Sequence, residues 1–274
     1  MVQRWYTGGT VEALTRSLFD LTQEHSCAVT RKTELEWTYS PADFFPEGDV
    51  GTPVGTVRLV SGKATLELAT PADPVPPDFT DRAIQAAQAL FLARAVATHR
   101  TYVLSERPNT VQTADDGRKV VLAMGTSRVT VSGRADFVLL GPDGSVIQDT
   151  KAEREGREAA LLADLAPKII KSPVLKALCE SYAKASADPA DEFVHLYEIR
   201  DRLKAHYGSE ASAIKALNFR AAWTALGKLT NNAPVSESRH RGLHGGAIRP
   251  ATENELRDAR EAALKLIEAF ARTV

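Results

Sequence analysis

Six consecutive residues carry the side chains best suited to chemistry, and they read Arg239-His240-Arg241-Gly242-Leu243-His244. An imidazole has a pKa near neutrality and can move protons to and from oxygen atoms. A guanidinium stays charged and can stabilise negative charge that develops on a phosphate. Together, the two kinds of side chain could act on a phosphate group. Nearby glycines and Pro250 predict that the six residues lie in a loop between two helices.

Four residues separate Arg239 from His244, and this pattern late in a helical region resembles the Arg-x4-6-His motif of the HEPN superfamily. Many members are metal-independent RNases of defence and toxin systems. The resemblance implies that His244 transfers protons, that Arg239 binds the phosphate and that His240 helps to orient it. Arg241 and Asn232 are expected to contact the substrate. We therefore expect an RNA-binding or RNA-cleaving protein of a bacterial defence or regulatory kind, with RNA as partner, a homodimer and no cofactor.

Two other interpretations of the same loop stay open. Its arginines could cap the carbonyls at a helix C-terminus or pair with Glu198 and Asp201. Helical domains of this superfamily can also lack activity, and the chain would then be a non-enzymatic interaction protein. The resemblance covers roughly residues 188 to 274 and does not reach the first half of the chain.

A second group of residues indicates a different enzyme class. The order Gly133-Arg134-Ala135-Asp136 followed by Asp149-Thr150-Lys151 is similar to the hairpin of the PD-(D/E)xK nucleases. That resemblance implies that Asp136 and Asp149 bind Mg²⁺, and that Lys151 acts on the attacking water or the phosphate. If the segment is a strand, Asp149 and Lys151 point to the same face. The alternative is a surface hairpin with a solvated Asp at its end.

The first half of the chain has the pattern of an α+β domain with an antiparallel sheet. Residues 56–60 and 64–68 alternate on either side of Ser61-Gly62-Lys63, which predicts a hairpin. Residues 81–99 predict a mostly buried helix. Further helical or extended segments are expected at residues 10–24, 34–39, 102–104, 111–113, 119–123, 128–131, 135–140 and 145–148, and a stiff proline-rich connector at 71–77.

The second half has the pattern of an all-α bundle. A helix from residue 153 is expected to break at Pro167, and Ser172-Pro173 is expected to open the next one. Gly208 should end the helix that follows residue 191. Thr252-Glu253-Asn254-Glu255 predicts a capping box before the last helix. The fold class is therefore α+β, with domains expected at residues 1–150 and 151–274.

Composition narrows the function classes. The 274 residues include 34 Lys and Arg against 35 Asp and Glu, so the net charge of −1 argues against a protein that coats nucleic acid. Cys27 and Cys179 form no metal-binding pair, which favours reduced thiols in a cytoplasmic protein. The start of the chain lacks the apolar core of a signal peptide, and no segment approaches the ~18 apolar residues of a membrane helix. We therefore expect no membrane partner.

Overall fold

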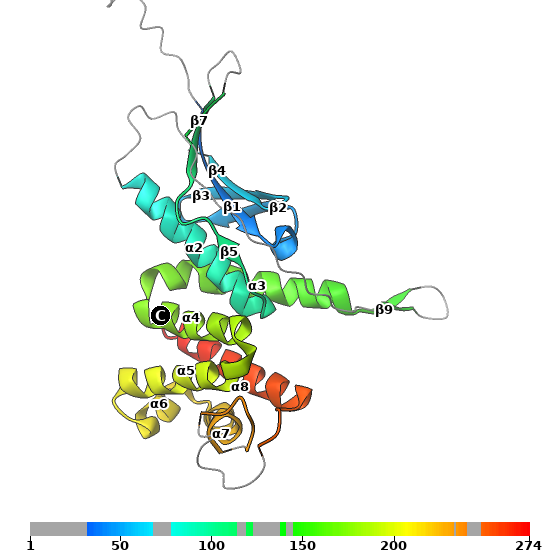
Figure 1. Cartoon of the computed structure of the whole chain (residues 1–274), viewed down its shortest axis with the longest axis vertical. Helices are drawn as coiled ribbons and strands as arrows, with labels where there is room; N and C mark the ends of the chain where they lie inside the picture. Colours follow the sequence, from blue (N-terminus) through cyan, green and yellow to red (C-terminus); the bar gives the residue numbers. More distant parts are fainter. Residues whose placement is uncertain are drawn as a thin grey trace, which may run out of the picture.

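The computed structural model describes residues 32–67, 78–113, 119–122, 138–140, 145–232, 234–239 and 248–274. The antiparallel sheet occupies one end of the molecule and most helices occupy the other, with α2 (Phe79–Thr98) and α3 (Thr150–Lys171) between them (Figure 1). The fold is α+β, as the sequence predicts. The helix expected at residues 10–24, the connector at 71–77 and the strand at 128–131 lie outside the described residues.

The main sheet is antiparallel, with strand order β2-β3-β4-β1-β6-β7 and with β5 pairing to β1. Its strands are β1 (Lys32–Ser40), β2 (Gly48–Thr52), β3 (Gly55–Val60), β4 (Lys63–Glu67), β5 (Val103–Leu104), β6 (Asn109–Thr113) and β7 (Lys119–Leu122). The predicted β3–β4 hairpin is confirmed. Ser61 and Gly62 both have positive φ, at 46° and 82°, as a tight hairpin turn between right-twisted strands requires.

Alternation along β1 sends Leu35, Trp37 and Tyr39 into the core, where each is at most 7% exposed. Helix α2 lies against this inner face and buries residues on all sides, because α3 and α4 (Pro173–Ala187) cover its other side. Phe91 of α2 contacts four aromatic rings, those of Tyr39, Phe44, Phe45 and Tyr102. The mostly buried helix that the sequence predicts is therefore confirmed.

A second, two-stranded sheet of β8 (Val138–Leu140) and β9 (Val146–Asp149) leads into α3, which projects from the body towards β9 in Figure 1. The prediction that this helix breaks at Pro167 is wrong, because α3 continues to Lys171. Proline removes one backbone hydrogen bond there. The buried side chains of Leu165 and Ile169, on either side of it, keep the helix packed against the core.

Three helix boundaries that the sequence predicts in the second half are confirmed. Ser172 caps α4 with its side chain, and Pro173 occupies the first turn. Gly208, with φ 79°, ends α5. Thr252 and Glu255 form the predicted capping box of α8. The bounds are a 3-10 turn (Pro189–Asp191), α5 (Glu192–Tyr207), α6 (Glu210–Leu217), α7 (Arg220–Gly227), a π-helical turn η3 (Lys228–Asn232) and α8 (Glu253–Ala271).

One hydrophobic cluster connects the inner face of the sheet, α2 and the helices of the second half. The expected boundary at residue 150 coincides with the start of α3, and a division into two domains there stays a prediction. In the parts of the chain that the structure describes, no helix is both long and apolar enough to cross a membrane.

Candidate nucleic-acid interface

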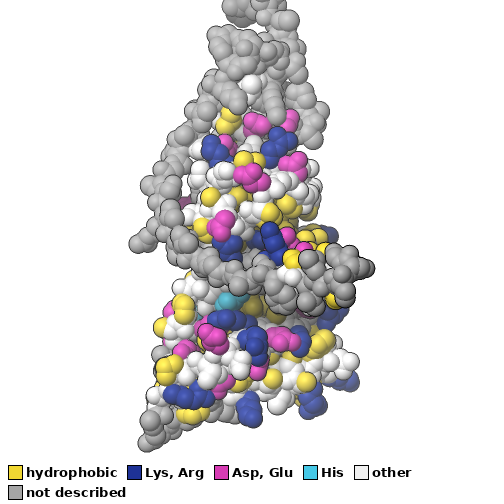
Figure 2. All heavy atoms as spheres, turned by 90° about the vertical axis from the view of Figure 1, so that its right-hand side faces the viewer, with side chains coloured by type: hydrophobic (Ala, Val, Ile, Leu, Met, Phe, Trp, Pro, Cys, Tyr) yellow, Lys and Arg dark blue, Asp and Glu magenta, His cyan; other side chains and the backbone are white. Residues whose placement is uncertain are grey.

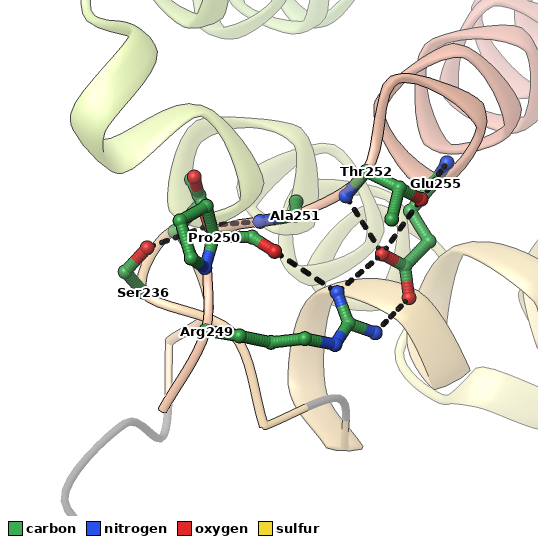
Figure 3. Close-up of polar contacts among 7 residues, drawn as sticks. Ser236, Arg249, Pro250, Ala251, Thr252 and Glu255 are labelled. Atoms are coloured by element: carbon green, nitrogen blue, oxygen red, sulfur yellow. Dashed lines mark hydrogen bonds and ion pairs between the residues drawn. The ribbon is translucent and has the colours of Figure 1, made fainter. Parts of the chain in front are cut away.

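The candidate loop joins η3 to α8, and a backbone bridge closes its base. The Ser236 N–H donates to the carbonyl of Arg249 at 2.9 Å, and the Arg249 N–H donates to the carbonyl of Pro234 at 3.3 Å. Figure 3 shows this base, with Ser236 beside the segment that leads from Arg249 into α8. The two described ends of the loop, at residues 234–236 and at Arg249, are therefore held side by side.

The end of the loop nearest α8 is fixed by Glu255. Its carboxylate accepts two hydrogen bonds from the Arg249 guanidinium, both at 2.7 Å, and one from the Thr252 N–H at 2.9 Å (Figure 3). These donors lower the pKa of Glu255 to about 2, the Arg249 hydrogen bonds having the largest effect. The capping box and the loop base thus share one carboxylate.

The other end of the loop is fixed through its backbone and through Glu237. The Arg239 N–H donates to the carbonyl of Thr230 at 3.2 Å, and the Ser238 N–H donates to the carbonyl of Val235 at 3.1 Å. Glu237 accepts from the Ala251 N–H at 2.9 Å, which ties this end to the start of α8. The position from which the Arg239 side chain leaves the backbone is therefore well determined.

The Arg239 guanidinium lies on α5. Its Nη1 donates to Asp201 Oδ2 at 2.8 Å, and its Cζ lies over the Tyr197 ring at 4.9 Å from the ring centre. The side chain remains 44% exposed. Of the two carboxylates expected to pair with the loop, Asp201 therefore does so. Glu198 accepts a hydrogen bond from Ser181 and lies near His195 instead.

The other predicted members of this site are described less fully. His240, Arg241 and His244 lie outside the described residues. Asn232 is the last residue of η3, and only its backbone is described. Arg239 is the one predicted site residue of this loop whose side-chain contacts can be stated.

One expectation for the alternative nuclease site is wrong, namely that Asp149 and Lys151 lie on the same strand. Asp149 ends β9 and caps α3, its Oδ1 accepting from the N–H groups of Lys151 and Ala152 at 3.0 Å each. Lys151 lies in the first turn of that helix, and its Nζ is 4.0 Å from Glu155. Asp149 and Lys151 thus do not share a face of one strand, because an Asp at this position satisfies the free N–H groups of a helix start. Asp136 lies outside the described residues, and among those described no three metal-binding side chains converge.

Sequence reasoning missed three residues of this site, which are Tyr197 and Arg200 of α5 and Trp223 of α7. Arg200 of α5 places its Cζ over the Tyr197 ring at 5.3 Å and over the Trp223 ring of α7 at 4.8 Å. Tyr197, Arg200 and Asp201 are three and four residues apart, the spacing that puts side chains on one face of a helix. That spacing could have identified the α5 part of the site, whereas the contact with Trp223 depends on how α5 and α7 pack.

None of the larger cavities of the described chain is lined by Arg239, and one of them is rich in charge. It has a volume of about 530 Å³, lies between α3 and α8, and is lined by Arg154, Arg157 and Arg272 together with Glu158, Asp164 and Glu268. On the face seen in Figure 2, Lys and Arg side chains alternate with Asp and Glu over the helical half. A cavity of about 560 Å³ lies among α2, β5 and α4, and one of about 510 Å³ lies among β2, α2 and α3. Neither is lined by Arg239 or its partners. In comparisons with known proteins, no family model, no curated protein and no solved structure matches the chain.

Proposed function

We propose that this protein binds RNA at the loop between η3 and α8 and cleaves it without a metal ion. Arg239 binds the scissile phosphate and His244 transfers the proton. His240 orients the phosphate, and Arg241 and Asn232 contact the neighbouring nucleotides. The proposal follows the resemblance of the Arg-x4-His segment to the HEPN superfamily.

One observation supports the proposal more than any other. The Arg239 guanidinium is held at the surface by Asp201 and Tyr197, yet 44% of its side chain stays exposed. An arginine that is oriented in advance and still reaches solvent suits the recognition of a phosphate. The bridge between Val235 and Arg249 holds the two ends of the loop together, and the proposal requires that the imidazoles between them reach the phosphate bound by Arg239.

The chemistry requires only groups that the loop carries. The ribose 2′-oxygen attacks the adjacent phosphorus while its proton passes to the His244 imidazole. The bond from phosphorus to the 5′-oxygen breaks, and that oxygen takes a proton from an imidazolium. The products are a 2′,3′-cyclic phosphate and a free 5′-hydroxyl, and Arg239 stabilises the charge on the phosphorane between them. The proposed homodimer would bring two copies of the segment to one substrate.

The test compares RNA and DNA substrates, each in EDTA and in Mg²⁺. We expect RNA cleavage that persists in EDTA and is lost in His244→Ala and Arg239→Ala. The matched control is Arg257→Ala, another exposed arginine, whose side chain pairs with Asp258 in α8. Cleavage only with Mg²⁺, abolished by Asp149→Ala, would instead support the nuclease alternative. RNA binding by the wild type that Arg239→Ala leaves unchanged would contradict the proposal.

A non-enzymatic role is the second candidate, and one observation favours it. Arg239 already has an ion-pair partner in Asp201, as expected of a basic loop that only fastens helices together. In that case, the protein would neither cleave nor bind RNA under any of the four conditions. Arg239→Ala would then change only the free energy of unfolding, by about 0–1 kcal/mol, as for other exposed pairs.

A further inference from the structure

Four side chains form a continuous stack of alternating aromatic rings and guanidinium groups from the core to the loop. Trp223 of α7 is 2% exposed, and Arg200 lies over its ring with Cζ at 4.8 Å from the centre. The same Arg200 Cζ lies 5.3 Å from the centre of the Tyr197 ring, and Arg239 lies over that ring at 4.9 Å. We call this series, from Trp223 through Arg200 and Tyr197 to Arg239, the cation–aromatic stack.

The inner part of the stack depends on a glycine. A Cβ added at Gly227 would lie 1.8 Å from Arg200 Nη1, so an alanine there would force the guanidinium to move. The Arg200 side chain is only 12% exposed, and its Nη2 lies 3.4 Å from Glu210 of α6. Its position is therefore set by α5, α6 and α7 together. Because the clash involves the end of a flexible side chain, Gly227→Ala should still fold.

The outer end of the stack leaves much of the Arg239 guanidinium available. Tyr197 covers one face, and Asp201 takes a hydrogen bond from Nη1. Among the described residues, no hydrogen-bond acceptor is assigned to Nε or Nη2 of Arg239. These two nitrogens form the edge with which arginine binds phosphate oxygens in a bidentate manner.

We infer that the cation–aromatic stack positions Arg239 for a backbone phosphate, so that Tyr197, Arg200 and Trp223 are positioning residues for RNA binding. The inference rests on the proposed function and adds the substrate class, a phosphodiester recognised independently of the base it carries. Each cation–aromatic contact fixes the next, and a change at Gly227 is transmitted through Arg200 and Tyr197 to Arg239. The hydrogen bond to Asp201 sets how the Arg239 guanidinium is rotated above the Tyr197 ring.

The first readout needs no RNA. In a ¹⁵N–¹H spectrum of the arginine side chains, the Hε signal of Arg239, assigned with Arg239→Lys, should be displaced by the Tyr197 ring current. We expect Tyr197→Leu to return it to the position of free arginine and Gly227→Ala to move it part of the way. Gly156→Ala is the matched control, because a Cβ at this helical glycine of α3 meets no atom within 4 Å.

The second readout is a double-mutant cycle on the binding of single-stranded RNA oligonucleotides of several sequences. Arg239→Ala should lower the slope of log Kd against log salt by about 0.7, the loss of one phosphate contact on a single strand. Gly227→Ala should weaken binding about threefold in the wild type and leave it unchanged in Arg239→Ala, whatever the RNA sequence.

The possible results distinguish the positioning role of the cation–aromatic stack from the proposed function in RNA binding. If Gly227→Ala leaves the Arg239 signal in place, or weakens RNA binding equally in both backgrounds, the positioning role is overturned. A dependence on base sequence that disappears in Arg239→Ala would overturn the assignment to a backbone phosphate. If the wild type binds no RNA while Gly227→Ala moves the Arg239 signal, the proposed function fails. In that case the stack still positions Arg239, but not for RNA.

Discussion

Glu255 accepts four hydrogen bonds at the start of α8, two from Arg249 and two from Thr252, at 2.7–2.9 Å. Glu255→Gln keeps the shape of the side chain but removes its charge and points an amide N–H₂ group at these donors. The lowered pKa of about 2 corresponds to about 3 kcal/mol if all of it reflects stabilisation of the fold. Because the Arg249 side chain is 48% exposed and screened by water, we expect a smaller loss, about 1–2 kcal/mol.

The loss should depend on pH in a defined direction. The pKa of Glu255 is lower in the folded state than the ordinary value of 4.5, so the unfolded chain binds its proton more readily. The contribution of the carboxylate to stability is then complete above pH 4.5 and is lost as the pH falls towards 2. The difference in unfolding free energy between the wild type and Glu255→Gln should therefore be largest at neutral pH and shrink across this interval.

Urea unfolding at a series of pH values, followed by circular dichroism, measures this difference. At neutral pH the midpoint of thermal unfolding should fall by about 2–4 °C. The control is Glu261→Gln on the same helix, whose carboxylate pairs with Lys265 in an exposed i,i+4 contact at 2.6 Å. That variant should lose no more than about 0.5 kcal/mol. An equal loss in both variants, or a Glu255→Gln deficit that persists at pH 2, would refute the reasoning.

Three further predictions concern the core. Glu192 is 1% exposed, and its carboxylate accepts two hydrogen bonds from the Arg260 guanidinium. Glu192→Gln removes that charge and should lower the free energy of unfolding, measured in urea, by about 3–5 kcal/mol. Phe91→Ala should lower the free energy of unfolding by about 3–5 kcal/mol. Because α2 joins the sheet to the helices in one core, the variant should still unfold in a single transition with a lower midpoint. Two separated transitions would contradict this. In Cys27→Ser, the buried Cys179 thiol, whose pKa is raised by burial, should react with a thiol reagent only after unfolding.

The parts of the fold that could be predicted are those that local sequence determines. Ser61-Gly62 supplies the positive φ values of the β3–β4 turn, and Gly208 supplies the one that ends α5. Ser172-Pro173 and the Thr252 capping box satisfy the free N–H groups of helix starts within a few residues. In each case the residues that decide the structure are neighbours in the chain.

The wrong predictions arose where a local rule competed with another interaction. Pro167 lacks the N–H that would bond the carbonyl four residues earlier, which normally ends a helix. Packing of Leu165 and Ile169 in the core outweighs that loss, and α3 continues. Alternation placed Lys151 on a strand with Asp149, but the capping hydrogen bonds of Asp149 start α3 one residue later. Neither competition can be decided from residue spacing alone.

One part of the candidate site could be predicted from the sequence and another part could not. That Asp201 can pair with an arginine of the loop could be predicted, because α5 was recognised as a helix and its acidic residues could be placed on its surface. The stack beneath Arg239 could not, because Arg200 and Trp223 belong to different helices and meet only through Gly227, which leaves room for the guanidinium. Gly227 is the last residue of α7, directly before η3. Its presence in α7 is accounted for by the space that Arg200 occupies, and this links a core position to the cation proposed to bind phosphate.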